Sequence, residues 1–325
     1  MGNPPYQRAC ACDGRQRSQP VYQHFVRAAK RLAPRYLTMV IPARWYTRAW
    51  GLGGFSEEML HDRHITQLHD FPDGSACFPG VDIKGGICCF LWERDAEDDC
   101  LVVSHRGAEP TAVRRPLLEP GADVFLRDER AVPIVRRLSR QGRRSFAELV
   151  SAQNPFGLGT SCRGHRHPEE GDVLLVRRDR RTAYVARGKV RRHAEWIDAW
   201  KVLVPEAGEG GTPPSKVLGR PLVAGPGTCC TGTFLLVGPF ANRQECLNAV
   251  SYIQTTAFRY LVSLRKITQH TNARTYAFVP ALPLAHPWTD ERVGAELGLT
   301  PAEHDMMASL VTPLDLGDGC LVVEP

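Results

Sequence analysis

The sequence predicts an α/β protein whose alternating helix–strand layer is followed by a mixed α+β domain. Three observations predict this. Helical and strand-like apolar patterns alternate over residues 1–107, residues 108–121 are rich in proline and charge, and residues 122–325 mix strands with one long helix. The 325 residues are 43% hydrophobic and 23% charged. They therefore suffice for two soluble domains joined by a linker at 108–121.

In the first domain, Pro20–Leu32 places apolar residues at helical spacing. Tyr36–Ile41 is largely apolar and ends at Pro42, which predicts a strand buried on both faces. Phe55–Asp62 predicts a short helix with Ser56 as its N-cap. Further strands are expected at Ile65–Phe71, Ile87–Trp92 and Cys100–Ser104, with the second of these central in the sheet.

The second domain is expected to be α+β. Its strands are predicted at Asp172–Val176, Thr182–Ala186 and Thr233–Val237, and its helices at Val132–Leu138 and Gln244–Val262. Loops rich in glycine and proline are expected at Asn154–Gly159 and Ala207–Ser215.

Positive charge is concentrated in residues 108–200. The net charge is +6, yet residues 108–200 alone carry 19 basic and 12 acidic side chains, a net of +7. Two stretches, Arg127–Arg144 and Arg177–Arg192, hold seven arginines each. The guanidinium fork suits phosphate and the edge of guanine, so these stretches indicate either a nucleic-acid partner or solvated faces of an arginine-rich chain.

The chain lacks a run of about 18 apolar residues, the length that a membrane span requires. Its first residues do not form the apolar stretch of a signal peptide, so a cytoplasmic location is expected and no membrane partner. The 11 cysteines include adjacent pairs in strand-like runs, which favours buried reduced thiols over disulfides.

Asn3-Pro4-Pro5-Tyr6 combines a side-chain carbonyl, two prolines without backbone donors, and a flat ring. This is a stiff pair of oxygen acceptors beside a stacking surface, which suits the exocyclic amine of a planar base. A base could reach it only by leaving the duplex. The alternative is a proline-rich turn at the terminus.

The tetrad resembles the catalytic motif of S-adenosylmethionine-dependent amino methyltransferases of DNA, in the form typical of the N6-adenine enzymes of restriction–modification systems. Later segments resemble blocks of the same family in the same order: Arg35–Trp45, Cys77–Cys88, Asn154–Leu158, Gly225–Thr228 and Leu261–Gln269. The resemblance implies the C-terminal part of a Rossmann-like methyltransferase sheet over residues 1–107, followed by a target-recognition domain over 122–325.

The resemblance also implies a role for each tetrad residue. Asn3 and the Pro4 carbonyl would accept hydrogen bonds from the N6 amine of a flipped adenine, and Tyr6 would stack on its ring. Pro5 and Phe78 would line the base pocket. Catalysis would be direct methyl transfer without a covalent enzyme intermediate, and double-stranded DNA would be the partner.

The family places its S-adenosylmethionine site upstream of this tetrad, and only two residues precede Asn3. We therefore expect a chain truncated at its N-terminus, inactive alone, whose cofactor motif is missing. An N-terminal methyltransferase fragment and a restriction endonuclease are the further partners considered. The alternative function is a DNA-binding specificity module without catalysis.

DNA contacts are expected from the arginine stretches and from the end of the long helix. The candidate residues are Arg136, Arg137, Arg140, Arg143, Arg144, Arg177, Arg178, Arg180, Arg181, Arg265, Lys266 and Gln269.

Two other sites are disfavoured. Cys162, His165 and His167 lack a fourth zinc ligand at a standard spacing, so no metal site is expected. The carboxylates of Glu93–Asp99 have no adjacent lysine and are expected to form a solvated turn rather than a nuclease centre.

Overall fold

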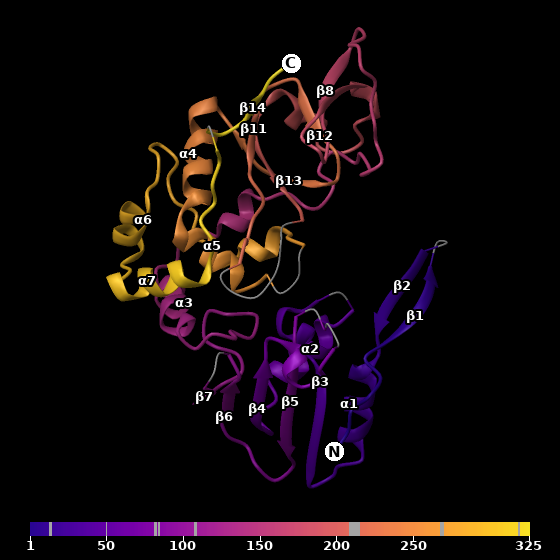
Figure 1. Cartoon of the computed structure of the whole chain (residues 1–325), viewed down its shortest axis with the longest axis vertical. Coiled ribbons are helices and arrows are strands. Elements are labelled where there is room, and N and C mark those ends of the chain that lie inside the picture. The colour runs from indigo at the N-terminus through magenta and orange to yellow at the C-terminus, as the bar shows by residue number, and fades with distance from the viewer. Residues whose placement is uncertain are drawn as a thin grey trace. The chain divides into compact units, whose positions relative to one another are not determined.

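The computed structural model describes residues 1–12, 15–49, 51–80, 83, 85–106, 109–207, 215–266, 270–317 and 319–325. The chain folds as two compact units, Met1–Gln141 and Gly142–Pro325 (Figure 1). Each is described below by itself, as the first and the second unit.

The first unit is built on a five-stranded mixed sheet with the order β3-β5-β4-β6-β7. Its strands are β3 (Tyr36–Pro42), β4 (Ile65–Phe71), β5 (Ile87–Glu93), β6 (Cys100–Ser104) and β7 (Thr111–Arg115). β5 pairs antiparallel with both β3 and β4, and β6 pairs parallel with β4. β3, β4 and β6 therefore run in one direction and end at the same edge of the sheet.

One face of this sheet carries the core. Ile41, Leu68, Cys88 and Phe90 are at most 1% exposed, whereas Val40 and its neighbours on the other face are partly exposed. Strand burial thus alternates, as expected when side chains of successive residues point to opposite faces. The prediction that Tyr36–Ile41 is buried on both faces is wrong, because Tyr36 is exposed and Thr38 and Val40 are partly exposed.

Three helices belong to the first unit: α1 (Tyr22–Arg31), α2 (Gly53–Leu60) and α3 (Ala131–Arg140). Tyr22 of α1 and Phe55 of α2 join the core of the sheet with Trp45 and Tyr46. Short 3-10 turns lie at η1 (Ala43–Thr47) and η2 (Gly74–Ala76). The predicted N-cap is wrong: Ser56 lies inside α2, and its hydroxyl donates to the Leu52 carbonyl at 2.9 Å.

The segment predicted as a linker contributes to the sheet. Residues 111–115 form β7, which pairs antiparallel with β6, and Arg115 is buried. The two units divide instead between Gln141 and Gly142. Prolines in the segment signalled a break, but they flank the strand and leave its backbone donors free to pair.

A hairpin that the apolar pattern did not predict follows the tetrad. β1 (Gln7–Cys12) pairs antiparallel only with β2 (Arg15–Pro20), from Gln7 opposite Pro20 to Cys12 opposite Arg15. Its polar sequence lacks the alternation that identifies a strand.

The second unit contains two further sheets. The four-stranded sheet has the order β13-β10-β11-β14, with β10 (Trp200–Pro205), β11 (Leu222–Ala224), β13 (Phe234–Phe240) and β14 (Val322–Val323). The three-stranded sheet has the order β12-β8-β9, with β8 (Asp172–Val176), β9 (Thr182–Ala186) and β12 (Thr228–Cys230). Their inner faces share one core, to which Leu175, Leu203 and Phe234 contribute.

The helices of the second unit are α4 (Arg243–Gln254), α5 (Thr256–Ser263), α6 (Asp290–Leu297) and α7 (Pro301–Leu310). The helix predicted over Gln244–Val262 is therefore two helices. Thr255 adopts an extended conformation between them, and its side chain accepts a hydrogen bond from the Phe258 amide as the N-cap of α5. Short 3-10 turns lie at η3 (Phe146–Leu149), η4 (Arg187–Lys189), η5 (Ala194–Asp198) and η6 (Ala273–Tyr276).

Among the residues that the structure describes, no helix combines the length and apolarity needed to span a membrane. The described cysteines are free thiols. Burial raises the pKa of both Cys88 and Cys229 to about 12, so these thiols stay protonated and unreactive at neutral pH.

Candidate active site

The tetrad lies at the carboxyl ends of the parallel strands. Gly2 bridges to Met39 of β3 in parallel: its amide donates to the Thr38 carbonyl at 2.9 Å, and its carbonyl accepts from the Val40 amide at 3.0 Å. From Asn3 the chain runs beside the last residues of β3, in the direction of its carboxyl end. Open α/β sheets bind ligands at this edge, outside the carboxyl ends of their strands.

The acceptors of the tetrad are not used within the described part of the chain. Asn3 is exposed, and neither its side chain nor the Pro4 carbonyl has a hydrogen bond to a described residue. Pro4 is buried and Pro5 is exposed. Two oxygen acceptors of adjacent residues therefore lack partners among the described residues, on a backbone stiffened by two prolines.

Tyr6 points its hydroxyl into the protein. The oxygen is buried without a hydrogen-bond partner among the described residues, while the Tyr6 carbonyl accepts from the Val21 amide at 3.1 Å. Burial raises the pKa of Tyr6, and the nearby Cys88 and Cys77 thiols raise it further. Since Cys77 precedes the half-buried Phe78, the structure brings the tetrad and the predicted pocket-lining segment together.

Gly86 fixes where that segment enters β5. It has φ of +76°, and a Cβ placed on it would lie 2.2 Å from the Phe71 carbonyl oxygen and 2.7 Å from that of Pro72. Only glycine allows this approach of two backbones. Val81, Asp82 and Lys84 of the segment lie outside the described residues.

Arg127 is a residue of this site that the sequence reasoning did not single out. Its guanidinium donates to the Gly85 carbonyl at 2.8 Å and to both oxygens of Asp70, at 2.9 and 2.5 Å. Asp70 is 0% exposed and lies at the carboxyl end of β4. An isolated buried carboxylate in a predicted strand is the only sequence signal that could have indicated such a pair.

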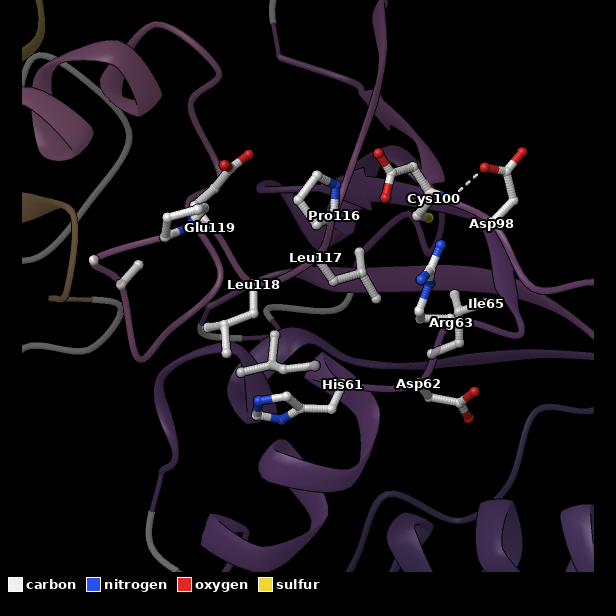
Figure 2. Close-up of a pocket in the computed structure, with 15 residues that line it drawn as sticks. His61, Asp62, Arg63, Ile65, Asp98, Cys100, Pro116, Leu117, Leu118 and Glu119 are labelled. Atoms are coloured by element: carbon white, nitrogen blue, oxygen red, sulfur yellow. Dashed lines mark hydrogen bonds between the residues drawn. The ribbon is translucent and has the colours of Figure 1, made fainter.

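A cavity of about 540 Å³ lies at the opposite edge of the same sheet. It is lined by Ile65 and Cys100, which begin β4 and β6, and Figure 2 shows His61 and Asp62 across it from Pro116 and Glu119. Its buried carboxylate, Glu119, is already paired with Arg115 and Arg136. The cavity is therefore separate from the tetrad.

The described residues do not fit S-adenosylmethionine. The glycine cluster Gly51–Gly54 follows the 3-10 turn η1 rather than a strand. The acidic residue on the next strand, Asp70 of β4, is buried and accepts hydrogen bonds from Arg127, so it is not available to hold a ribose.

The arginines predicted in the first stretch are mostly paired. Arg136 contacts Glu119 at 2.5 Å, Arg143 contacts Glu296 at 2.6 Å and Arg144 contacts Glu148 at 2.5 Å. Arg137 is half-buried and has an interaction partner, and Arg140 is exposed at the end of α3. These five residues do not form one free cationic surface.

The arginines predicted at 177–181 surround the turn of the β8–β9 hairpin. Asp179 contacts Arg177 at 3.4 Å and Arg181 at 3.5 Å, and Arg180 donates to the Arg220 carbonyl at 2.7 Å. Arg178 is exposed. One carboxylate thus offsets part of this charge.

The predicted contacts at the end of α5 are turned inward. Arg265 is 9% exposed, with its guanidinium 4.9 Å from the ring centre of Phe278. Lys266 donates to the Val217 carbonyl at 2.7 Å, and burial lowers its pKa to about 8. Gln269 lies outside the described residues.

Within the described residues, no group of three or more potential ligand side chains could hold a metal ion. His165 is engaged by the Asp172 carboxylate rather than by Cys162. In the acidic turn, Asp95 pairs with Arg94 and Asp98 pairs with Arg114.

Comparison with known proteins finds similarity over the part of the chain that contains this site. Residues 1–78 match the Eco57I restriction-modification methylase family. The chain is also 35% identical over 105 residues to an uncharacterized adenine-specific methylase of Mycoplasma pneumoniae, which covers 31% of this chain and 25% of that protein. The chain thus spans about a quarter of the length of this curated relative.

Two solved structures show a weaker likeness. The type IIL restriction-modification enzyme MmeI, solved in complex with DNA, is 10% identical with a TM-score of 0.43, over 88% of this chain and 46% of that one. The type IIG restriction endonuclease BpuSI is 9% identical with a TM-score of 0.32, over 76% and 40% of the two chains.

The family match includes the tetrad, the strand β3 beside which it lies, and β4. The resemblance read from the residues is confirmed there: residues 1–78 are similar to the Eco57I restriction-modification methylases, and the chain shares a stretch of 105 residues with an adenine-specific methylase.

Proposed function

We propose that the chain acts in site-specific methylation of adenine N6 in double-stranded DNA, as part of a restriction–modification system. The observation that carries this proposal is the tetrad near the carboxyl end of β3, with Asn3 and the Pro4 carbonyl unpartnered among the described residues and Tyr6 close to Cys77 and Cys88. Its arrangement agrees with the C-terminal part of a Rossmann-like methyltransferase sheet.

The residues of this chain would act on a base that has left the duplex. Asn3 Oδ1 and the Pro4 carbonyl would accept the two hydrogens of the adenine amine. This would hold the nitrogen lone pair towards the methyl donor. Tyr6 would stack on the purine, with Pro5 and Phe78 closing the pocket around its edge.

The methyl donor of the family is S-adenosylmethionine. Because the described residues do not fit it, the proposed partners are double-stranded DNA and a polypeptide that carries the cofactor-binding half, with a restriction endonuclease as a further partner. The same misfit supports the second candidate, a DNA-binding specificity module without chemistry of its own.

Methyl transfer to unmethylated bacterial DNA, with labelled S-adenosylmethionine and mass spectrometry of the nucleosides, tests the proposal. Together with a polypeptide that carries the cofactor-binding half, the wild-type chain should yield N6-methyladenine, whereas the chain alone should not. Under the same conditions Asn3→Ala should reduce the yield about a hundredfold or more. Gln7→Ala, a neighbouring exposed change outside the tetrad, is the matched control. DNA binding without product would favour the specificity module, and neither binding nor product would contradict both functions.

A further inference from the structure

A basic loop in the second unit connects β9 to β10, and its base is closed by an ion pair. Arg187 donates to both oxygens of Asp198, one of them at 2.8 Å. Between these two residues the side chains of Val190 and Ile197 enter the core, at 8% and 0% exposure. Residues 191–195 are exposed between these two anchors.

This loop is held by the Asn154–Leu158 and Gly225–Thr228 blocks, neither of which takes part in the proposed chemistry. At one end the Arg191 amide donates to the Phe156 carbonyl at 3.2 Å, and a Cβ on Gly157 would lie 3.3 Å from that of Arg191. At the other end the Gly227 amide donates to the Ile197 carbonyl at 2.9 Å. Both ends of the loop are thus held by backbone hydrogen bonds.

A buried cation reinforces the second end. Lys201 is 0% exposed, and its ammonium donates to the carbonyls of Ile197, Ala199 and Gly225 at 3.1, 2.9 and 3.2 Å. Two of these acceptors belong to the end of the loop and one to the Gly225–Thr228 block, so one donor group joins the two segments.

Inside the loop, two rings are stacked. The His193 and Trp196 ring centres are 3.7 Å apart with an interplanar angle of 4°. Trp196 packs against the core, whereas His193 is exposed, so the outer face of the imidazole is open. His193 Nδ1 also lies 3.3 Å from Glu195 Oε1.

The charges beside this stack are free. Arg191 and Arg192 are exposed, and neither has an ion pair or side-chain hydrogen bond with a described residue. An anchored loop with two unpaired guanidinium groups next to an exposed ring matches the needs of duplex DNA. Arginine side chains bind backbone phosphates, and an imidazole ring and a carboxylate can form hydrogen bonds with base edges.

We propose that the 187–198 loop is the DNA-contacting element of the second unit, with Arg191 and Arg192 on backbone phosphates and His193 and Glu195 at the bases. This inference deepens the proposed function and rests on it. It locates the contact at the end of the β8–β9 hairpin remote from the Arg177–Arg181 turn, because five-residue strands separate the two ends by roughly 17 Å.

The test compares two double variants of equal charge in the full chain. Arg191→Gln/Arg192→Gln removes the proposed contacts, and Arg274→Gln/Arg292→Gln removes two exposed arginines from η6 and α6 of the same unit. Binding of a labelled DNA duplex is measured over a range of salt concentrations. Circular dichroism and thermal unfolding of each variant verify that it is folded.

The loop variant should bind at least about tenfold more weakly at moderate salt, with its log–log salt slope reduced by about 1.8 for two lost phosphates. The control should bind within about twofold of the wild type with an unchanged slope, as expected away from the contact surface. Equal losses in the two variants would overturn the inference. A wild type that does not bind DNA even at low salt would instead refute the proposed function, and stronger binding of duplex RNA would overturn the assignment to DNA.

His193→Ala separates base contact from phosphate contact. In selection from a random duplex pool, this variant should enrich a shorter or degenerate sequence while its salt slope stays that of the wild type. An unchanged selected sequence would remove the base-contact role from His193.

Discussion

The two arginine-rich stretches hold the same number of arginines but have different surroundings. In Arg127–Arg144, five of the seven guanidinium groups have ion pairs with carboxylates, and Arg127 and Arg136 pair with the buried Asp70 and Glu119. In Arg177–Arg192, Asp179 and Asp198 engage three arginines, and Arg191 and Arg192 are left to solvent. The difference lies in the partners that the fold supplies.

This contrast shows why a count of charges is a weak guide to a binding surface. A guanidinium buried against a carboxylate is a structural element whose removal leaves the carboxylate uncompensated. A guanidinium on an anchored loop can exchange water and counterions for phosphate. The predictions below test which description applies to each group.

The largest effect is expected from Arg127→Leu. It leaves Asp70, 0% exposed, without its partner, which should lower the unfolding free energy of the first unit by about 3–5 kcal/mol. Urea unfolding followed by hydrogen exchange of β4 and β5 peptides measures this. The double variant Asp70→Leu/Arg127→Met, which removes both charges, should recover most of the loss. A single variant within about 1 kcal/mol of the wild type would show that the pair is not a structural element.

A smaller effect is expected from Glu119→Gln, which weakens the interaction with Arg115 and Arg136 together. Arg115 is 6% exposed, and burial lowers its pKa, so loss of the neighbouring negative charge should cost about 2–3 kcal/mol. The same hydrogen-exchange measurement applies. Glu58→Gln, which affects an exposed pair with Arg27, should cost less than about 1 kcal/mol.

Lys201 extends the comparison to a buried cation without a carboxylate. Burial lowers its pKa to about 8, against about 10.4 for a free lysine. Between these two values the unfolded chain binds more protons than the folded chain. The free-energy cost of burying a charged Lys201 therefore falls as pH rises. The unfolding free energy of wild type minus that of Lys201→Met should therefore grow from pH 8 to pH 10.5. A difference that is flat or falls over this range would contradict a lowered pKa.

The smallest effect is expected at the base of the proposed DNA-contacting loop. Arg187 and Asp198 are 44% and 59% exposed, so Asp198→Asn should change the unfolding free energy by less than about 0.5 kcal/mol. Its effect on DNA binding at moderate salt should be an increase, since one negative charge beside the loop is removed. Weaker binding would indicate that the ion pair is needed to hold the loop.

Regular elements were predicted best where their own residues carry the signal. The bounds of β4, β6, β8 and β9 match the predicted strands residue for residue. The β1–β2 hairpin and β10 were missed, and the α4–α5 helix was predicted unbroken. Polar pairing between β1 and β2, and the cap that Thr255 provides between two apolar helices, depend on contacts that periodicity does not contain.

The residues of the candidate site also differ in how far the sequence could predict them. Asn3–Tyr6 could be singled out because two prolines, an amide and a ring specify local chemistry without knowledge of the fold. Arg127 and the 187–198 loop could not, because their roles depend on residues distant in sequence: Asp70 and Gly85 for the first, Phe156 and Gly227 for the second.

The residues alone determined the methylase tetrad, most strands of the first unit and the excess of arginine after residue 107, since these depend on side-chain chemistry and local spacing. The tertiary structure decided which arginines are neutralised and which stay free, and that the tetrad lies at the carboxyl ends of β3 and β4. The physical reason is that the energy with which a surface charge can attract a ligand depends on its burial and on its distance from the nearest opposite charge. Both are set by segments that only folding brings together.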